Sequence, residues 1–251
     1  MKRQVLSVAL LLTLVTVGRA QTPTPASRTE PASQVEKVKN KYTPDFTPGC
    51  VPTQKEIAEL EQDVAARPDD FRLMRKLGIG HFYQYFGGGL DAAAPKSQKM
   101  LERALALQQD DALTTAFLGA LASVRGARAK DPDERTAQQR HSFELYQKAR
   151  ELEPDNLGVL SLAGPAYLAL PESYDGPKRA LEVSQRIRRL LGPEFKTWSE
   201  HGQQRVLFTQ GVALVRLGRP AEARVCFEDG LKVNEKSVEA RMLKAELDKL
   251  K

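Results

Sequence analysis

The chain has 251 residues, of which 41% are hydrophobic and 28% are charged, so it has enough apolar residues for a folded core. Its formal net charge is +6, and part of this charge is clustered between residues 178 and 189. No aromatic side chain interleaves with that cluster to stack on bases. Composition and charge therefore argue against a nucleic-acid partner.

The first 20 residues have the three parts of a secretory signal peptide. A basic start at Lys2 and Arg3 precedes an apolar run over 5–17, and small residues end the segment at Ala20. The run is shorter than the roughly 20 residues that span a membrane. We expect cleavage near Ala20, export to the periplasm or the cell exterior, and no membrane span. The leader carries three basic and no acidic residues, so the mature chain has a net charge of +3.

Residues 21–52 contain six prolines together with Thr, Ser, Lys and Glu, and few bulky apolar side chains. Such a composition cannot offset the entropy of ordering, so it predicts a disordered linker. Thr53 and Glu56 have the spacing of a capping box, and order is predicted to begin there. One helical domain is expected over 53–251. Its first helix carries apolar residues at helical spacing: Ile57, Leu60 and Val64.

Short polar pairs precede three of the later apolar helices, at Asp69-Asp70, Asp110-Asp111 and Asp155-Asn156. A carboxylate or amide at this position accepts the free amide protons of a helix start and suits the helix dipole. Paired acids also occur in metal sites and in general acid–base catalysis, but their recurrence at helix starts favours capping.

Helix pairs with small residues at matching positions recur along the domain. The pairs are predicted at about 69–109, 110–154, 155–192 and 200–235, and a closing helix at 237–250. The closing helix is expected to pack through Val238, Met242, Ala245 and Leu250. The pairs are longer than a regular 34-residue repeat, and we expect loops to absorb the difference, at 87–89, 125–132 and 171–176.

The clearest unit runs from residue 205 to 237. Gly211 takes a close-contact position in its first helix, Ala223 a small position in its second, and Phe227 an aromatic wedge. Their spacing resembles that of the tetratricopeptide repeat, W-x2-L-G-x2-Y…A-x3-F…P. Other consensus positions hold different residues: Leu207, Gln210, Leu214 and Glu235. The chain is similar to exported bacterial members of this family.

The resemblance implies an all-α fold, a right-handed α-solenoid of about four helix pairs with flanking helices. The first helices in this family line a concave groove, so the resemblance implies a non-catalytic scaffold for a protein or peptide partner. The groove-facing positions predict a cationic and aromatic rim of partner-binding residues: Arg72, Arg75, Phe82, Tyr83, Arg205, Phe208 and Arg216. The alternative is a periplasmic protein that binds a small molecule or lipid beside an uptake system or in envelope assembly. The glycines at 87–89, beside Phe82, Tyr85 and Phe86, are the expected place for such a cavity.

Little in the sequence suggests chemistry. His81, His141 and His201 have no second ligand at metal-binding spacing, and nucleophile-elbow and phosphate-loop motifs are missing. We therefore expect no enzymatic activity, cofactor or metal. His81 is expected to be a packing residue or a pH-sensitive groove residue. The oligomeric state stays open.

Two cysteines lie at opposite ends of the expected repeat stack. A disulfide needs Cα atoms within about 7 Å, whereas each repeat contacts only its neighbours. Cys50 and Cys226 are therefore predicted to be unpaired.

Overall fold

The computed structural model describes residues 51–170 and 172–250, and the predicted leader, linker and Cys50 fall outside this part. The described residues are all-α, with ten α-helices and two short 3-10 helices and no strand, which confirms the all-α part of the predicted fold class. The elements are α3 (Gln54–Ala66), α4 (Phe71–Phe86), α5 (Ala93–Leu107), α6 (Ala112–Arg128), α7 (Pro132–Leu152), α8 (Leu157–Leu168), η1 (Glu172–Tyr174), α9 (Gly176–Leu191), η2 (Gly192–Thr197), α10 (Glu200–Arg216), α11 (Pro220–Val233) and α12 (Val238–Asp248).

Side-chain caps start the helices where the sequence predicts them. In α3 the Thr53 hydroxyl accepts from the Glu56 amide at 3.2 Å, while the Thr53 amide donates to the Glu56 carboxylate at 2.7 Å. The second residue of each predicted polar pair, Asp70, Asp111 and Asn156, caps α4, α6 and α8. Such a cap stabilises a helix by about 1 kcal/mol, so the short turns between helices are defined by local sequence.

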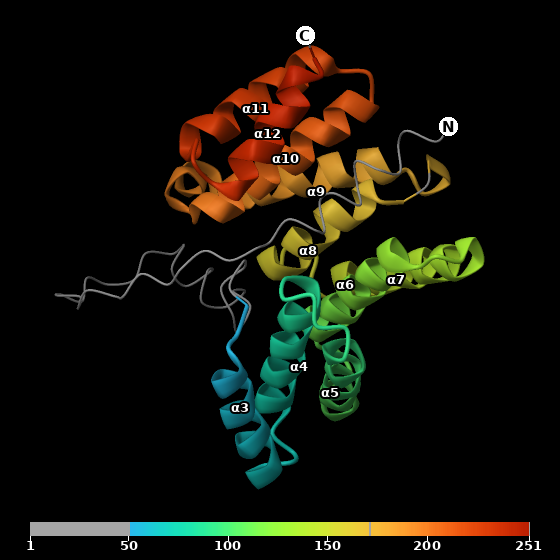
Figure 1. Cartoon of the computed structure of the whole chain (residues 1–251). Helices are drawn as coiled ribbons and strands as arrows, with labels where there is room; N and C mark the ends of the chain where they lie inside the picture. Colours follow the sequence, from blue (N-terminus) through green and yellow to red (C-terminus); the bar gives the residue numbers. More distant parts are fainter. Residues whose placement is uncertain (1–50, 171, 251) are drawn as a thin grey trace, which may run out of the picture.

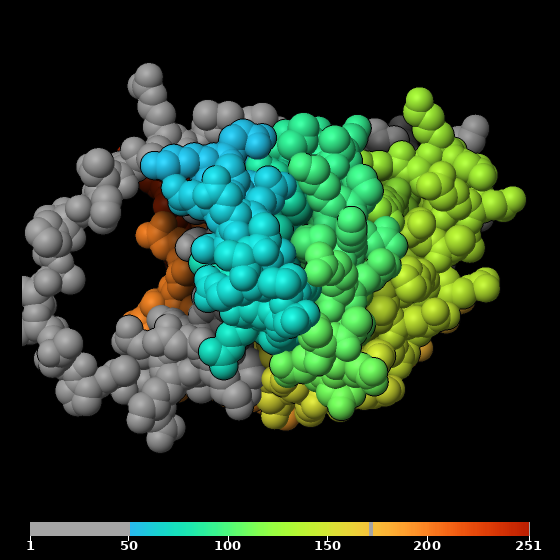
Figure 2. Space-filling model, turned by 90° about the horizontal axis from the view of Figure 1, so that it is seen from below, coloured from blue at the N-terminus to red at the C-terminus, as the bar shows by residue number. Residues whose placement is uncertain are grey.

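Consecutive helices pack as pairs, α4 with α5, α6 with α7, α8 with α9, and α10 with α11. The pairs follow chain order in space, with α3 to α5 at one end and α10 to α12 at the other (Figure 1). The second helix of each pair also contacts the first helix of the next, and α12 takes this place after α11. Viewed from below, the surfaces of α3 and of the green helices that follow it lie side by side (Figure 2).

The closest helix contacts occur where glycine leaves room for a large side chain. A Cβ on Gly211 would overlap the ring of Phe227, which is fully buried, and would lie 2.7 Å from its Cδ1 atom. A Cβ on Gly78 would lie 2.8 Å from the side chain of Leu101. The predicted wedge is therefore the contact that brings α10 and α11 together.

The prediction for one connection is wrong, and the prediction for the packing of the closing helix is right only in part. Residues 125–132 are not a loop, because α6 continues to Arg128 and α7 starts at Pro132. Gly126 is buried near Gln138 and lets these two helices approach instead of breaking one. In α12 the buried residues are Ala240 and Leu243, and Leu243 lies against Gly230. Of the four residues predicted to pack, Ala245 is exposed and Val238 is partly buried, whereas Met242 and Leu250 are partly buried and pack against the core.

Apolar side chains form one large cluster and one small separate cluster. The large cluster extends from α4 to α12. The small cluster joins α3 to the first half of α4 and to the second half of α5, through Ile57, Leu60, Val64, Met74, Leu77 and Ala104. The packing of α3 therefore depends on few apolar contacts and on the polar groups between it and its neighbours.

Candidate functional site

The first helices of successive pairs form a row. Contacts join α4 to α6, α6 to α8, α8 to α10, and α10 to α12. Each helix of this first-helix row keeps at least one apolar side chain that is only partly buried against the core, and among these residues are Phe86, Leu118, Leu162, Val212, Val215 and Met242. Apolar side chains that remain partly accessible on adjacent elements supply area that a bound protein would cover, provided that they form a contiguous patch.

The aromatic residues predicted as apolar anchors of the groove lie in the core and do not form a rim. Phe82 packs edge-on against Phe117 of α6 with 5.5 Å between ring centroids, and Tyr83 lies 6.2 Å from the same ring. Phe208 lies 6.4 Å from Phe227. All three are buried, Phe82 and Tyr83 against the next first helix and Phe208 against the second helix of its own pair.

Two of the predicted arginines connect successive first helices. Arg75 of α4 donates to Asp111, the N-cap of α6, at 3.1 Å, and Arg216 of α10 donates to the carbonyl of Leu168 in α8. Arg205 is partly buried and Arg72 is exposed. Of the predicted site residues, the structure therefore brings Phe82 and Tyr83 together. The arginines of α4 and those of α10 are separated, because α6 and α8 lie between these two helices.

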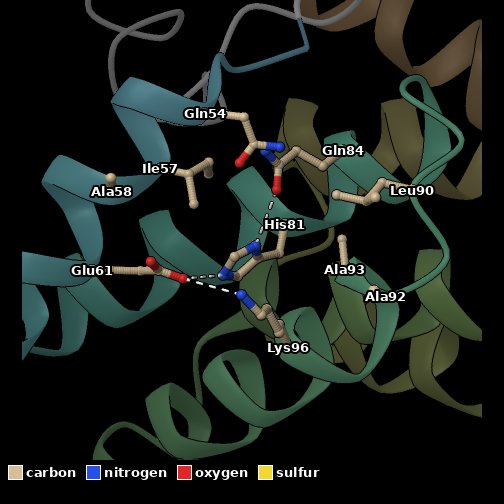
Figure 3. Close-up of a pocket in the computed structure, with 10 residues that line it drawn as sticks. All are labelled: Gln54, Ile57, Ala58, Glu61, His81, Gln84, Leu90, Ala92, Ala93 and Lys96. Atoms are coloured by element: carbon tan, nitrogen blue, oxygen red, sulfur yellow. Dashed lines mark hydrogen bonds and ion pairs between the residues drawn. The ribbon is translucent and has the colours of Figure 1, made fainter.

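A cavity of about 130 Å³ lies between α3, α4 and the start of α5. The cavity lies close to the glycines 87–89, where the sequence predicted a ligand cavity, because Leu90 lines it. The three aromatic residues expected to line it, Phe82, Tyr85 and Phe86, are not among its lining residues. Figure 3 shows His81 at its centre, with side chains of α3 on one side and of α5 on the other. The lining residues are Gln54, Ile57, Ala58, Glu61, His81, Gln84, Leu90, Ala92, Ala93 and Lys96.

Two nitrogen atoms from different helices face one carboxylate oxygen at this cavity. Oε1 of Glu61 lies 3.6 Å from Nε2 of His81 and 3.4 Å from Nζ of Lys96. On the other side of the imidazole, Nδ1 lies 3.3 Å from Oε1 of Gln84. A neutral imidazole has one N–H, so only the protonated ring can donate to both oxygens.

The electrostatic surroundings of His81 oppose its protonation. Burial lowers the pKa of the imidazole below its ordinary value, the hydrogen bond to Gln84 raises it, the charge of Lys96 lowers it, and that of Glu61 raises it. Burial is the largest of these effects and lowers the pKa overall, whereas additional negative charge beside the ring would raise it.

Sequence reasoning identified His81 but missed Glu61 and Lys96. These residues are 35 positions apart, and neither belongs to a motif. They meet because α3 packs on α4 with its polar side towards the start of α5, which helical periodicity alone does not specify.

Within residues 51–170 and 172–250, no three His, Cys, Asp or Glu side chains gather to hold a metal ion. None of the described helices is long and apolar enough to cross a membrane. Cys226 is a free, buried thiol, and burial raises its pKa.

No family model matches the chain, and no curated protein matches its sequence.

Proposed function

We propose that the protein is an exported, non-catalytic scaffold in which a tetratricopeptide-like, right-handed stack of four helix pairs binds a protein or peptide partner. The observation that carries this proposal is the first-helix row, which runs from α4 to α12 with partly exposed apolar side chains. The contact of each second helix with the next first helix is the pattern expected of stacked repeats.

The binding surface proposed here differs from the rim predicted by sequence. Phe82, Tyr83 and Phe208 stabilise the stack, whereas Leu162 of α8 and Val212 of α10 are partly exposed. These two helices contact each other. They therefore provide an apolar surface at the middle of the row, where a partner segment would bury the most area.

A partner-capture assay with charged variants tests this surface. Leu162→Asp and Val212→Asp should each weaken capture from the native envelope, because an unpaired carboxylate would be buried under the partner. The matched control is Val225→Asp on α11, where valine is 55% exposed and outside the row. Circular dichroism must show that all three variants keep their helical content.

Salt dependence separates the contribution of charge from that of apolar contact. Arg72 is exposed at the first turn of α4, so Arg72→Ala should reduce capture mainly at low salt through a slower association rate. Normal capture by Leu162→Asp and Val212→Asp, together with loss of capture by Val225→Asp, would contradict the proposed surface.

A further inference from the structure

The cavity beside His81 has the dimensions and lining of a small-ligand site. A cavity of about 150 Å³ can hold a benzene ring, and this one measures about 130 Å³. Ile57, Leu90 and Ala93 give it apolar walls, and Leu90 stays 42% exposed at its edge. Polar groups line the rest: Gln54, Glu61, His81, Gln84 and Lys96. It shares no residue with α6, α8 or α10, so it is separate from the middle of the first-helix row.

The contacts of Glu61 show how this site holds a carboxylate. His81 and Lys96 come from different helices and face the same oxygen of Glu61. Both distances exceed the 2.7–2.9 Å of a strong charge-assisted hydrogen bond. The side chains of Glu61 and Lys96 are 45% and 60% exposed, respectively. Glu61 is thus weakly held and can rotate into solvent without leaving its charge buried.

We propose that this cavity binds a small carboxylate, whose oxygen replaces that of Glu61 between His81 and Lys96. The short apolar body of the ligand then lies against Ile57, Leu90 and Ala93. The resident carboxylate shows the required geometry, and the adjacent cavity supplies the space for the rest of a ligand of about six heavy atoms.

Binding in this position is linked to protonation of His81. The charged groups that face the imidazole are Glu61 from α3 and Lys96 from α5, and Gln84 of α4 accepts on its other side. The ligand carboxylate brings a second negative charge to the site, because Glu61 turns into solvent but remains on the neighbouring turn of α3, and the added charge favours the imidazolium form. The ligand therefore binds more tightly in mild acid than at neutral pH.

An NMR titration of the protein with butyrate, in a buffer free of carboxylates, tests the proposal. Butyrate should shift the resonances of His81 and Ala93 with a millimolar dissociation constant, and uncharged butyramide should bind at least about fivefold more weakly, the scale of one partly exposed ion pair. Affinity for butyrate should rise about tenfold from pH 7.5 to pH 5.5.

Matched variants on the same helices identify the residues that act. Lys96→Gln should weaken butyrate binding about fivefold, whereas Lys99→Gln, at an exposed position of α5 that does not line the cavity, should not change it. Glu61→Gln should tighten binding because the competing carboxylate is gone, and Glu59→Gln on the exposed side of α3 should have no effect. Both cavity variants alter exposed groups, so folding is preserved.

The source of the carboxylate is distinguished by a second probe. A short peptide with one glutamate and blocked ends tests a partner's acidic side chain, and butyrate tests a free acid. Binding of either probe that depends on Lys96 supports the proposal. Absence of binding by both probes, or binding that Lys96→Gln leaves unchanged, overturns it.

Discussion

Phe227 is the side chain on which the packing of α10 against α11 depends most directly. It is fully buried, and its ring fills the space that a Cβ of Gly211 would occupy. Phe227→Ala removes a ring from a close-packed site and leaves a cavity, and such substitutions cost about 3–5 kcal/mol. We expect the free energy of unfolding, measured in urea by circular dichroism, to fall by this amount.

A second substitution tests the geometry of this contact. Gly211→Ala alone should clash with the ring of Phe227, a cost of about 1–3 kcal/mol, which is partly offset by about 1 kcal/mol from the better helix propensity of alanine. In the double variant the new methyl group enters the space left by the ring. Gly211→Ala should therefore stabilise the Phe227→Ala protein by about 1 kcal/mol.

The control for both measurements is Val225→Ala, which truncates an apolar side chain that is 55% exposed on the same helix. We expect it to change stability by less than about 0.5 kcal/mol. A loss in Phe227→Ala no larger than in this control, or strictly additive effects of the two substitutions at 211 and 227, would refute the packing described for this helix pair.

Three further predictions concern ionisation, thiol reactivity and export. Burial raises the pKa of Glu239, but its hydrogen bond with His201 and the nearby positive charge outweigh burial and lower the pKa below the usual 4.5. The ionised Glu239 side chain therefore stabilises the folded state above pH 4.5, and this stabilisation is lost as the pH falls through the lowered pKa. The free energy of unfolding of Glu239→Gln should consequently fall less than that of the parent protein between pH 6 and about pH 3. Because burial raises the pKa of Cys226, iodoacetamide should label it much more slowly in the native protein than in denaturant, and equal rates in peptide mass spectrometry would contradict its burial. After expression in a secreting host, the intact mass should correspond to a chain that starts at Gln21, and an exported chain that keeps residues 1–20 would refute the cleavage.

Local features of the fold could be predicted from sequence because their determinants lie within a few residues. The Thr53–Glu56 capping box and the caps at Asp70, Asp111 and Asn156 each involve side chains two or three positions from the amides they bind. The all-α class follows from the same periodic segments that these caps precede.

Features that depend on contacts between helices were predicted less well. The apolar spacing in α12 favours Met242, but the buried residue is Leu243, because Gly230 of α11 leaves space for it. Phe82 and Phe208 lie on helices whose neighbours enclose them, and the sequence of a single helix does not indicate how closely the next one approaches. The Glu61–Lys96 contact likewise requires the position of α3 on the first pair.

The most direct test of the proposed function is site-specific photocrosslinking in the native envelope. A benzophenone amino acid at Leu162 or Val212 places the reactive group on the first-helix row, and the same group at Lys148 or Val225 places it on exposed positions of second helices. We expect both first-helix positions to form an adduct with the same partner and the second-helix positions to form none. Adducts confined to Lys148 and Val225 would contradict the proposed function.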